Sequence, residues 1–180
     1  GSDAVLAAMR RNYKAGFYAD LLLRLAEEVP GIGLGCDVLC GFPGETRQDH
    51  TATLRLLDQS PAAFLHAFAY SPRPGTAAAA LPPLSPGEVA ARTRSVGALG
   101  RSKREAFARS QMGRPLEALT LSPDSGHGRA LTSNFLDVRL DRSVPHNRWV
   151  TVRLTSWEGS APRGEILVEG DLRTGSRGLA

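Results

Sequence analysis

One stretch, Cys36–Thr46, constrains the fold more than any other part of the chain. It reads Cys-Asp-Val-Leu-Cys-Gly-Phe-Pro-Gly-Glu-Thr, an apolar run that breaks into a turn rich in glycine. The following residues, Thr46–Asp49, have the Thr-x-x-Asp spacing of a capped helix start. This order of elements is typical of α/β proteins, which present backbone N–H groups to ligands at the carboxyl ends of strands. An ordinary strand-to-helix loop would explain the same residues.

Helical and strand patterns alternate on both sides of this turn. Apolar periodicity predicts helices at about 16–29 and 46–59 and strands at 32–40 and 64–70. This alternation implies parallel strands joined by crossover helices. Two such strands cannot close a barrel or stand alone.

A basic helix is predicted from Ser85-Pro86-Gly87-Glu88, which has a capping serine, a proline at the first position and a glutamate at the third. Residues 85–112 contain six basic and two acidic side chains. The net charge of this segment therefore equals the formal net charge of the whole chain, which is +4. Such a helix is compatible with contact to phosphates, and an ordinary solvated helix face is the alternative. Gly97 and Gly100 are expected to weaken it.

After Gly113 the helical pattern gives way to short β-like runs. Five short β-like runs follow, at 115–121, 128–131, 135–140, 148–154 and 163–169. Turn clusters such as Pro-Asp-Ser-Gly separate them, which predicts a small closed or half-open barrel. With 42% hydrophobic residues and no apolar run of about 18 residues, the chain has a globular composition and no membrane partner is expected.

Three motifs in this order resemble the radical S-adenosylmethionine methylthiotransferases. They are Gly-Phe-Pro-Gly-Glu-Thr at 41–46, a Met-x-Arg-x-Tyr block at 9–13 and Tyr-Ser-x-Arg-x-Gly-Thr at 70–76. The block at 132–138 is similar to the TRAM domain, the RNA-binding barrel that ends these enzymes. The resemblance implies an α/β fold, namely the C-terminal portion of a partial (β/α) TIM-like barrel, followed by a small all-β OB-like TRAM barrel. It also implies that a missing N-terminal part of the same polypeptide completes the sheet.

The resemblance also divides the chain. We expect the end of the radical enzyme barrel at 3–84, a basic connecting helix at 85–112, the TRAM-like barrel at 113–172 and a disordered tail at 173–180. The implied cofactors are S-adenosylmethionine and [4Fe-4S] clusters whose ligands lie outside this chain. Cys36 and Cys40 have the first spacing of the C-x-x-x-C-x-x-C cluster motif, but Pro43 occupies the third position. As strand residues about 13 Å apart they suit neither cluster nor disulfide.

No residue is therefore expected to be catalytic or to bind metal, and the fragment alone should be inactive. The residues expected to line the cofactor pocket are Arg11, Gly41, Phe42, Pro43, Gly44, Glu45, Tyr70, Ser71 and Arg73. The residues expected to contact RNA are Arg101, Lys103, Arg104, Arg129, Asn134, Phe135 and Arg148. For two residues the structural explanation is preferred, with His66 as a core histidine and Phe135 as barrel core.

The implied activity is that of a cytoplasmic tRNA methylthiotransferase, which adds a methylthio group to a modified adenosine beside the anticodon. The Leu65-His66-x-Phe68 block resembles the branch that modifies N6-threonylcarbamoyladenosine. Its partner would be the anticodon arm of tRNA. A non-catalytic RNA-binding module and a methylthiotransferase acting on a ribosomal protein are the alternatives. A C-x-x-x-C-x-x-C motif within about a hundred residues upstream would separate an enzyme from a binding module.

Overall fold

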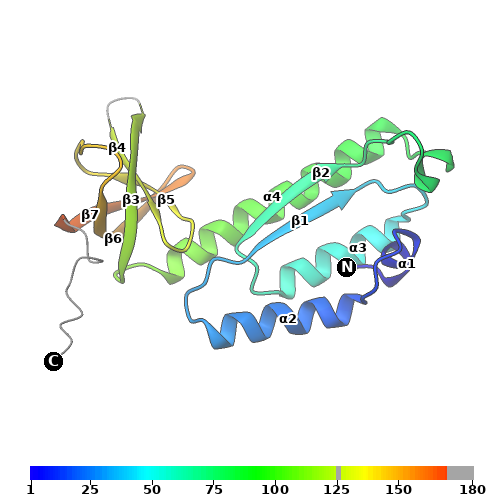
Figure 1. Ribbon diagram of the computed structural model, residues 1–180, viewed down its shortest axis with the longest axis horizontal. Helices are drawn as coiled ribbons and strands as arrows, with labels where there is room; N and C mark the ends of the chain where they lie inside the picture. The colour runs from blue at the N-terminus through cyan, green and yellow to red at the C-terminus, as the bar shows by residue number, and fades with distance from the viewer. Residues whose placement is uncertain (125–126, 170–180) are drawn as a thin grey trace. The chain divides into compact units, whose positions relative to one another are not determined.

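The computed structural model describes residues 1–124 and 127–169. The chain divides into two compact units, Gly1–Arg104 and Glu105–Ala180. The first unit contains α1 (Asp3–Ala8), α2 (Ala15–Glu28), β1 (Gly35–Cys40), α3 (Arg47–Gln59), β2 (Phe64–Ala69), the 3₁₀ turn Ala77–Ala80 and most of α4 (Pro86–Ser110), all drawn in Figure 1. The predicted order of helices and strands is confirmed.

The two strands of the first unit pair in parallel, from Gly35 opposite Phe64 to Cys40 opposite Ala69. The helix between them, α3, begins as the sequence predicts. Thr46 accepts the backbone N–H of Asp49 on its hydroxyl, and the Asp49 carboxylate accepts the backbone N–H of Thr46. This reciprocal cap satisfies donors that the first helical turn leaves free, so the helix start follows directly from local sequence.

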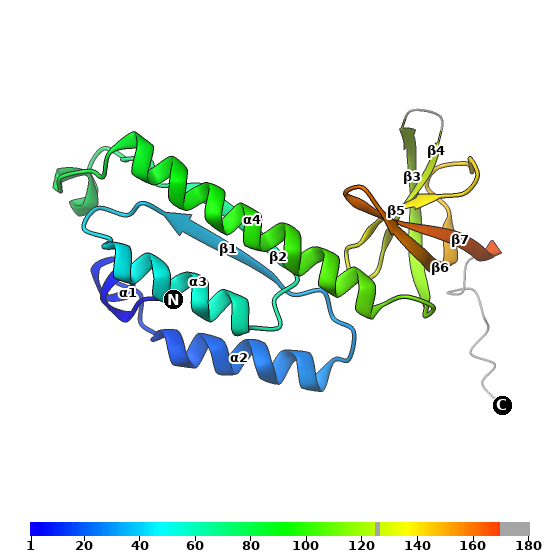
Figure 2. The ribbon, with the colours of Figure 1, turned by 180° about the vertical axis from the view of Figure 1, so that it is seen from behind.

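The helices of the first unit pack on one face of its sheet. The side chains of Cys36, Val38 and Cys40 point to this face and join one core with Leu22 of α2, Leu57 of α3 and Val96 of α4. Figures 1 and 2 show these helices running along the two strands. On the opposite face Asp37 and Phe68 are exposed, and neither belongs to the core that the described residues of this unit form. Helices on one face only are the arrangement of a (β/α) barrel wall, whereas a doubly wound sheet has helices on both faces.

Two details differ from expectation. His66 is exposed on the uncovered face, so the expectation of a core histidine is wrong: the residue alternates outward, opposite Asp37 of β1. Gly100 does not act merely as a weak point of α4. A Cβ atom there would lie 3.2 Å from the Cβ of Leu65, so the glycine lets the helix approach β2 closely.

The second unit contains a closed five-stranded barrel. Its strands are β3 (Pro115–Asp124), β4 (His127–Thr132), β5 (Asp137–Leu140), β6 (Trp149–Glu158) and β7 (Ala161–Glu169). Around the barrel they follow the order β3-β4-β5-β7-β6, and β5 and β7 form its parallel pair while the other pairs are antiparallel. This is the strand order of a five-stranded Greek-key OB barrel. The predicted fold class, an α/β portion followed by an OB-like barrel, is confirmed.

The barrel core follows the period of two expected of strands with one buried face. Its fully buried side chains include Val138, Leu140, Val152 and Leu154. All five predicted β-like runs fall on observed strands. The tail predicted to be disordered, 173–180, lies outside the described residues.

Candidate functional site

The strand ends of the first unit meet at the predicted ligand-binding turn. The backbone N–H of Tyr70 donates to the carbonyl of Cys40 at 2.8 Å, which joins the ends of β2 and β1. The Phe42 ring meets the Tyr70 ring edge-on, with ring centroids 5.6 Å apart. Gly41 has a φ of +82°, and a Cβ there would lie 2.6 Å from a methyl carbon of Val89. Glycine is therefore required at Gly41 by both conformation and space.

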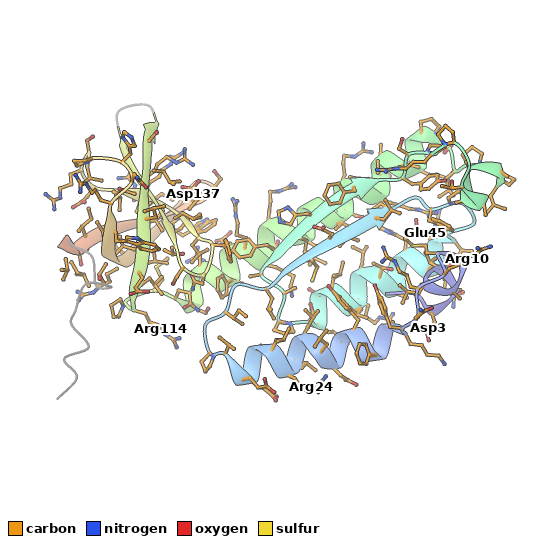
Figure 3. The ribbon with its side chains drawn as sticks, in the orientation of Figure 1. Asp3, Arg10, Arg24, Glu45, Arg114 and Asp137 are labelled. Carbon is orange, nitrogen blue, oxygen red and sulfur yellow. The ribbon has the colours of Figure 1, made fainter. Side chains whose placement is uncertain are left out.

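Glu45 holds this turn from inside. Its carboxylate accepts the backbone N–H of Gly41 at 2.7 Å and the Arg92 guanidinium at 2.7 Å. The same guanidinium nitrogen also donates to the Glu45 carbonyl at 2.8 Å. The side chains of Glu45 and Arg92 are 4% and 11% exposed. Figure 3 labels Glu45 beyond the end of β1. Glu45 was predicted to line the cofactor pocket, and its observed partners are the turn and α4.

His50 and Ser95 extend the same buried network. His50 Nε2 lies 2.8 Å from the Ser95 hydroxyl, which donates its own hydrogen to the Arg92 carbonyl at 2.7 Å. The imidazole therefore donates through Nε2, and its Nδ1 faces Glu45 Oε1 at 3.8 Å. Burial lowers the pKa of His50, against the opposing effect of Glu45. Four side chains from α3, α4 and the turn thus fix the backbone that the predicted pocket presents.

The remaining predicted pocket residues lie in two places. The hydroxyl of Tyr70 is buried and has no hydrogen-bond partner among the described residues. Ser71 and Arg73 are exposed in the turn after β2, where the Arg73 carbonyl accepts the Thr76 hydroxyl at 2.8 Å. Arg11 is exposed and lines a cavity of about 170 Å³ beside β1, which Glu45 also lines.

The cysteines of the first unit are not placed to hold a cluster. Cys36 and Cys40 are buried in the core beneath the helices, and burial raises the pKa of both thiols, so they stay protonated. In the described part of the chain no three His, Cys, Asp or Glu side chains come together as a metal site. The residues present therefore do not fit a [4Fe-4S] cluster. They do fit a polar organic ligand, since a buried hydroxyl without an acceptor lies beside a turn with left-handed glycines.

The predicted RNA contacts on α4 have different surroundings. Arg101 is exposed and lines a groove beside β2. The Lys103 ammonium donates to the carbonyls of Asp58 and Ser60, at 2.9 and 2.7 Å, and so caps the end of α3. Burial lowers the pKa of Lys103. Arg104 is partly buried. Of the three, Arg101 is the one that is exposed.

The predicted RNA contacts on the barrel differ in their exposure. Phe135 is 64% exposed with a φ of +68°, so the expectation that it belongs to the core is wrong. Its neighbour Asn134 is buried, where it accepts the Thr132 hydroxyl at 2.6 Å and fixes the turn that carries Phe135. Arg129 pairs with Asp137, which Figure 3 labels on the barrel, and Arg148 is exposed.

A segment of a parallel β/α wall followed by an OB-type barrel defines the class of protein by its architecture. The chain's curated relatives within this class are tRNA methylthiotransferases, and it belongs to their family. It is 35% identical over 173 residues to the tRNA-2-methylthio-N(6)-dimethylallyladenosine synthase of Methylobacillus flagellatus, covering 93% of this chain and 39% of the relative. The synthase of the same name from Acidothermus cellulolyticus is 36% identical over 156 residues, covering 86% and 30%.

A relative from a second branch matches as well. The threonylcarbamoyladenosine tRNA methylthiotransferase MtaB of Aquifex aeolicus is 33% identical over 140 residues, covering 77% of this chain and 33% of the relative. The chain thus spans about two fifths or less of the length of these relatives. No protein-family model matches it. The resemblance that the three motifs indicate is confirmed.

Sequence reasoning missed the residues that hold the turn. Arg92 is separated from Glu45 by 47 residues, and His50 from Ser95 by 45. The sequence places Arg92 among the six basic residues of 85–112, because a charge pattern along one helix gives no sign of a partner on another element. The capping box at Thr46 was found, because its partners lie three residues apart.

Proposed function

We propose that this chain forms the C-terminal part of a tRNA methylthiotransferase, an enzyme that attaches a methylthio group to a modified adenosine in the anticodon arm of tRNA. The support is homology over 93% of the chain to a relative named for this reaction. The carrying structural observation is the buried hydroxyl of Tyr70, which has no hydrogen-bond partner among the described residues and lies beside the Gly41–Glu45 turn. It lies where barrel enzymes bind their ligands.

The pocket at these strand ends is proposed to hold S-adenosylmethionine. In the whole enzyme this cofactor supplies the methyl group and, after reduction by a [4Fe-4S] cluster held outside this chain, the radical chemistry. The turn at Gly41–Glu45 would offer backbone N–H groups, and the Tyr70 hydroxyl would donate to a polar atom of the ligand. Arg73 would pair with a carboxylate or phosphate through its planar fork. Arg11 and Ser71 are proposed to complete the rim.

The modified adenosine has two candidates. The block around His66 favours N6-threonylcarbamoyladenosine, as does the Aquifex relative by its name. The names of the Methylobacillus and Acidothermus relatives favour N6-dimethylallyladenosine. Incubation of the whole protein with tRNAs carrying each modification, followed by mass spectrometry of the nucleosides, decides between them. A methylthio group on neither tRNA would refute the proposal and leave a ribosomal protein or a purely binding role.

The barrel is proposed to bind the anticodon arm, with Phe135 stacking on an unpaired base and Arg129 and Arg148 near the RNA backbone. On α4 of the first unit, Arg101 and Arg104 are proposed as separate phosphate contacts. Lys103 instead caps α3, and Asn134 supports the turn that carries Phe135. A cytoplasmic location is proposed with this role. Within the described residues, no helix has the length and apolar character of a membrane span.

Tyr70→Phe tests the pocket separately from the reaction. In this chain the variant should be as stable as the wild type or more so, because it removes a buried hydroxyl without a partner. In the whole protein it should weaken S-adenosylmethionine binding by about tenfold, the effect of one lost hydrogen bond of about 1–1.5 kcal/mol. Unchanged affinity by equilibrium dialysis would place the ligand elsewhere.

A further inference from the structure

Three arginines lie side by side across the outer face of the barrel. Arg129 of β4 is directly opposite Arg139 of β5, and Arg139 is directly opposite Arg163 of β7. We call these three residues the arginine row. All three alternate with buried neighbours, such as Val138 and Leu140, so their side chains leave the barrel on the same outer face.

The two outer members of the row are tied to carboxylates. Arg129 pairs with Asp137 through two nitrogens, and Arg163 Nε lies 2.6 Å from Glu158 Oε2. The central member, Arg139, is exposed, and no ion pair to it is found among the described residues. Among the described residues, one guanidinium without an ion pair therefore stands between two that are paired with carboxylates.

This placement is unfavourable for the isolated barrel. Like charges directly opposite each other on neighbouring strands are destabilising. The row is not part of a generally basic surface, since residues 113–169 contain as many carboxylates as arginines. A like-charge row on an otherwise balanced barrel is expected where an anion completes it.

The position of the row indicates which anion. In OB barrels the face of the second and third strands binds oligonucleotides, and here these strands are β4 and β5, which carry Arg129 and Arg139. Phe135 precedes β5 by two residues and shares the outward alternation of Asp137 and Arg139. An RNA strand crossing β5 would thus meet an aromatic ring and a planar guanidinium suited to phosphate.

We propose that the arginine row is a phosphate-binding site for RNA, with Arg139 as its direct contact and Arg129 and Arg163 as flanking donors held in place by Asp137 and Glu158. The site rests on the proposed tRNA function and adds to it the residues that contact the backbone. Binding at this face is local: one phosphate is engaged by Arg139, and long-range attraction by the neutral barrel contributes little.

The test uses the whole 180-residue chain and a synthetic anticodon stem-loop RNA, with the dissociation constant measured at several salt concentrations. Arg139→Gln should flatten the dependence of log K on log salt by about 0.7–0.9 and weaken binding about sixfold near 0.1 M salt, the loss of one phosphate contact. Arg139→Lys should keep most of the slope. Arg153→Gln is the matched control, because Arg153 is exposed on β6 of the same barrel and lies 3.5 Å from Glu165.

A stability measurement separates contact from structure. Trp149 and Trp157 are the only tryptophans of the chain and both lie in β6, so their fluorescence follows barrel unfolding. Arg139→Gln should leave the barrel equally or more stable, since it relieves like-charge repulsion. Equal slopes for wild type, Arg139→Gln and Arg153→Gln would overturn the arginine row while leaving tRNA binding intact. An equal loss in both glutamine variants would also overturn it, and absence of RNA binding by the wild type would refute the row and the proposed RNA role together.

Discussion

Arg92→Met removes one partner of a buried ion pair and keeps a long apolar side chain. Glu45 and Arg92 are 4% and 11% exposed, and their charged atoms lie 2.7 Å apart. Breaking such a pair leaves a buried carboxylate without its counter-charge, which costs about 3–5 kcal/mol. This is a large fraction of the total stability of a domain, which is about 5–15 kcal/mol. With a urea m-value of roughly 1.5 kcal/mol/M, the midpoint should fall by about 2–3 M.

The two units offer separate signals for this measurement. Helices α1 to α3 and most of α4 belong to the first unit, so circular dichroism at 222 nm follows that unit. The fluorescence of Trp149 and Trp157 follows the barrel. Arg92→Met should therefore shift the dichroism transition and leave the fluorescence transition near its wild-type midpoint.

Two variants complete the argument. Arg94 is exposed and lies two residues after Arg92 on the same helix. The variant Arg94→Met should therefore change the free energy of unfolding by less than about 0.5 kcal/mol. The double variant Glu45→Gln/Arg92→Met should be more stable than Arg92→Met alone. A neutral amide oxygen can still accept the Gly41 N–H, and no buried charge remains. If Arg92→Met behaves like Arg94→Met, the pair does not hold the turn and the reasoning fails.

Three further outcomes are expected. Because burial lowers the pKa of His50 below its ordinary value of 6.5, the unfolded chain binds the proton more readily and the first unit should lose stability as pH falls from about 7 toward 5.5; a His50→Gln variant with the same pH dependence of its dichroism midpoint would contradict this. Phe135→Ala should leave barrel stability nearly unchanged, since the ring is 64% exposed, and weaken binding to a stem-loop by about 1–3 kcal/mol but binding to a blunt duplex far less; barrel unfolding by fluorescence would count against it. Residues 3–84 expressed alone should aggregate, because α4 contributes Val96 and Leu99 to their core, and a well-dispersed amide NMR spectrum of that piece would refute the expectation.

Local sequence determined the elements of this protein. The signals act over short range. The capping box joins Thr46 to a residue three positions later, and Gly41 and Gly44 adopt positive φ values that glycine reaches without steric cost. Strand alternation likewise gave five β-like runs that fall on the five barrel strands. Periodicity and capping act over one or two turns of chain, so they are legible without knowledge of the fold.

Tertiary structure alone decided which of these residues are free to act. The sequence around His66 and Phe135 predicts core residues. His66 is exposed because it lies on the uncovered face of the sheet, and Phe135 because the turn fixed by Asn134 directs it outward. Arg92 and Lys103 lie in the basic segment that predicts phosphate contacts. In the structure Arg92 pairs with Glu45, and Lys103 caps α3. The arginine row exists only in the strand register, which joins residues up to 24 positions apart in the sequence. The partners of these side chains come from segments that are distant in the sequence, so no local pattern predicts them.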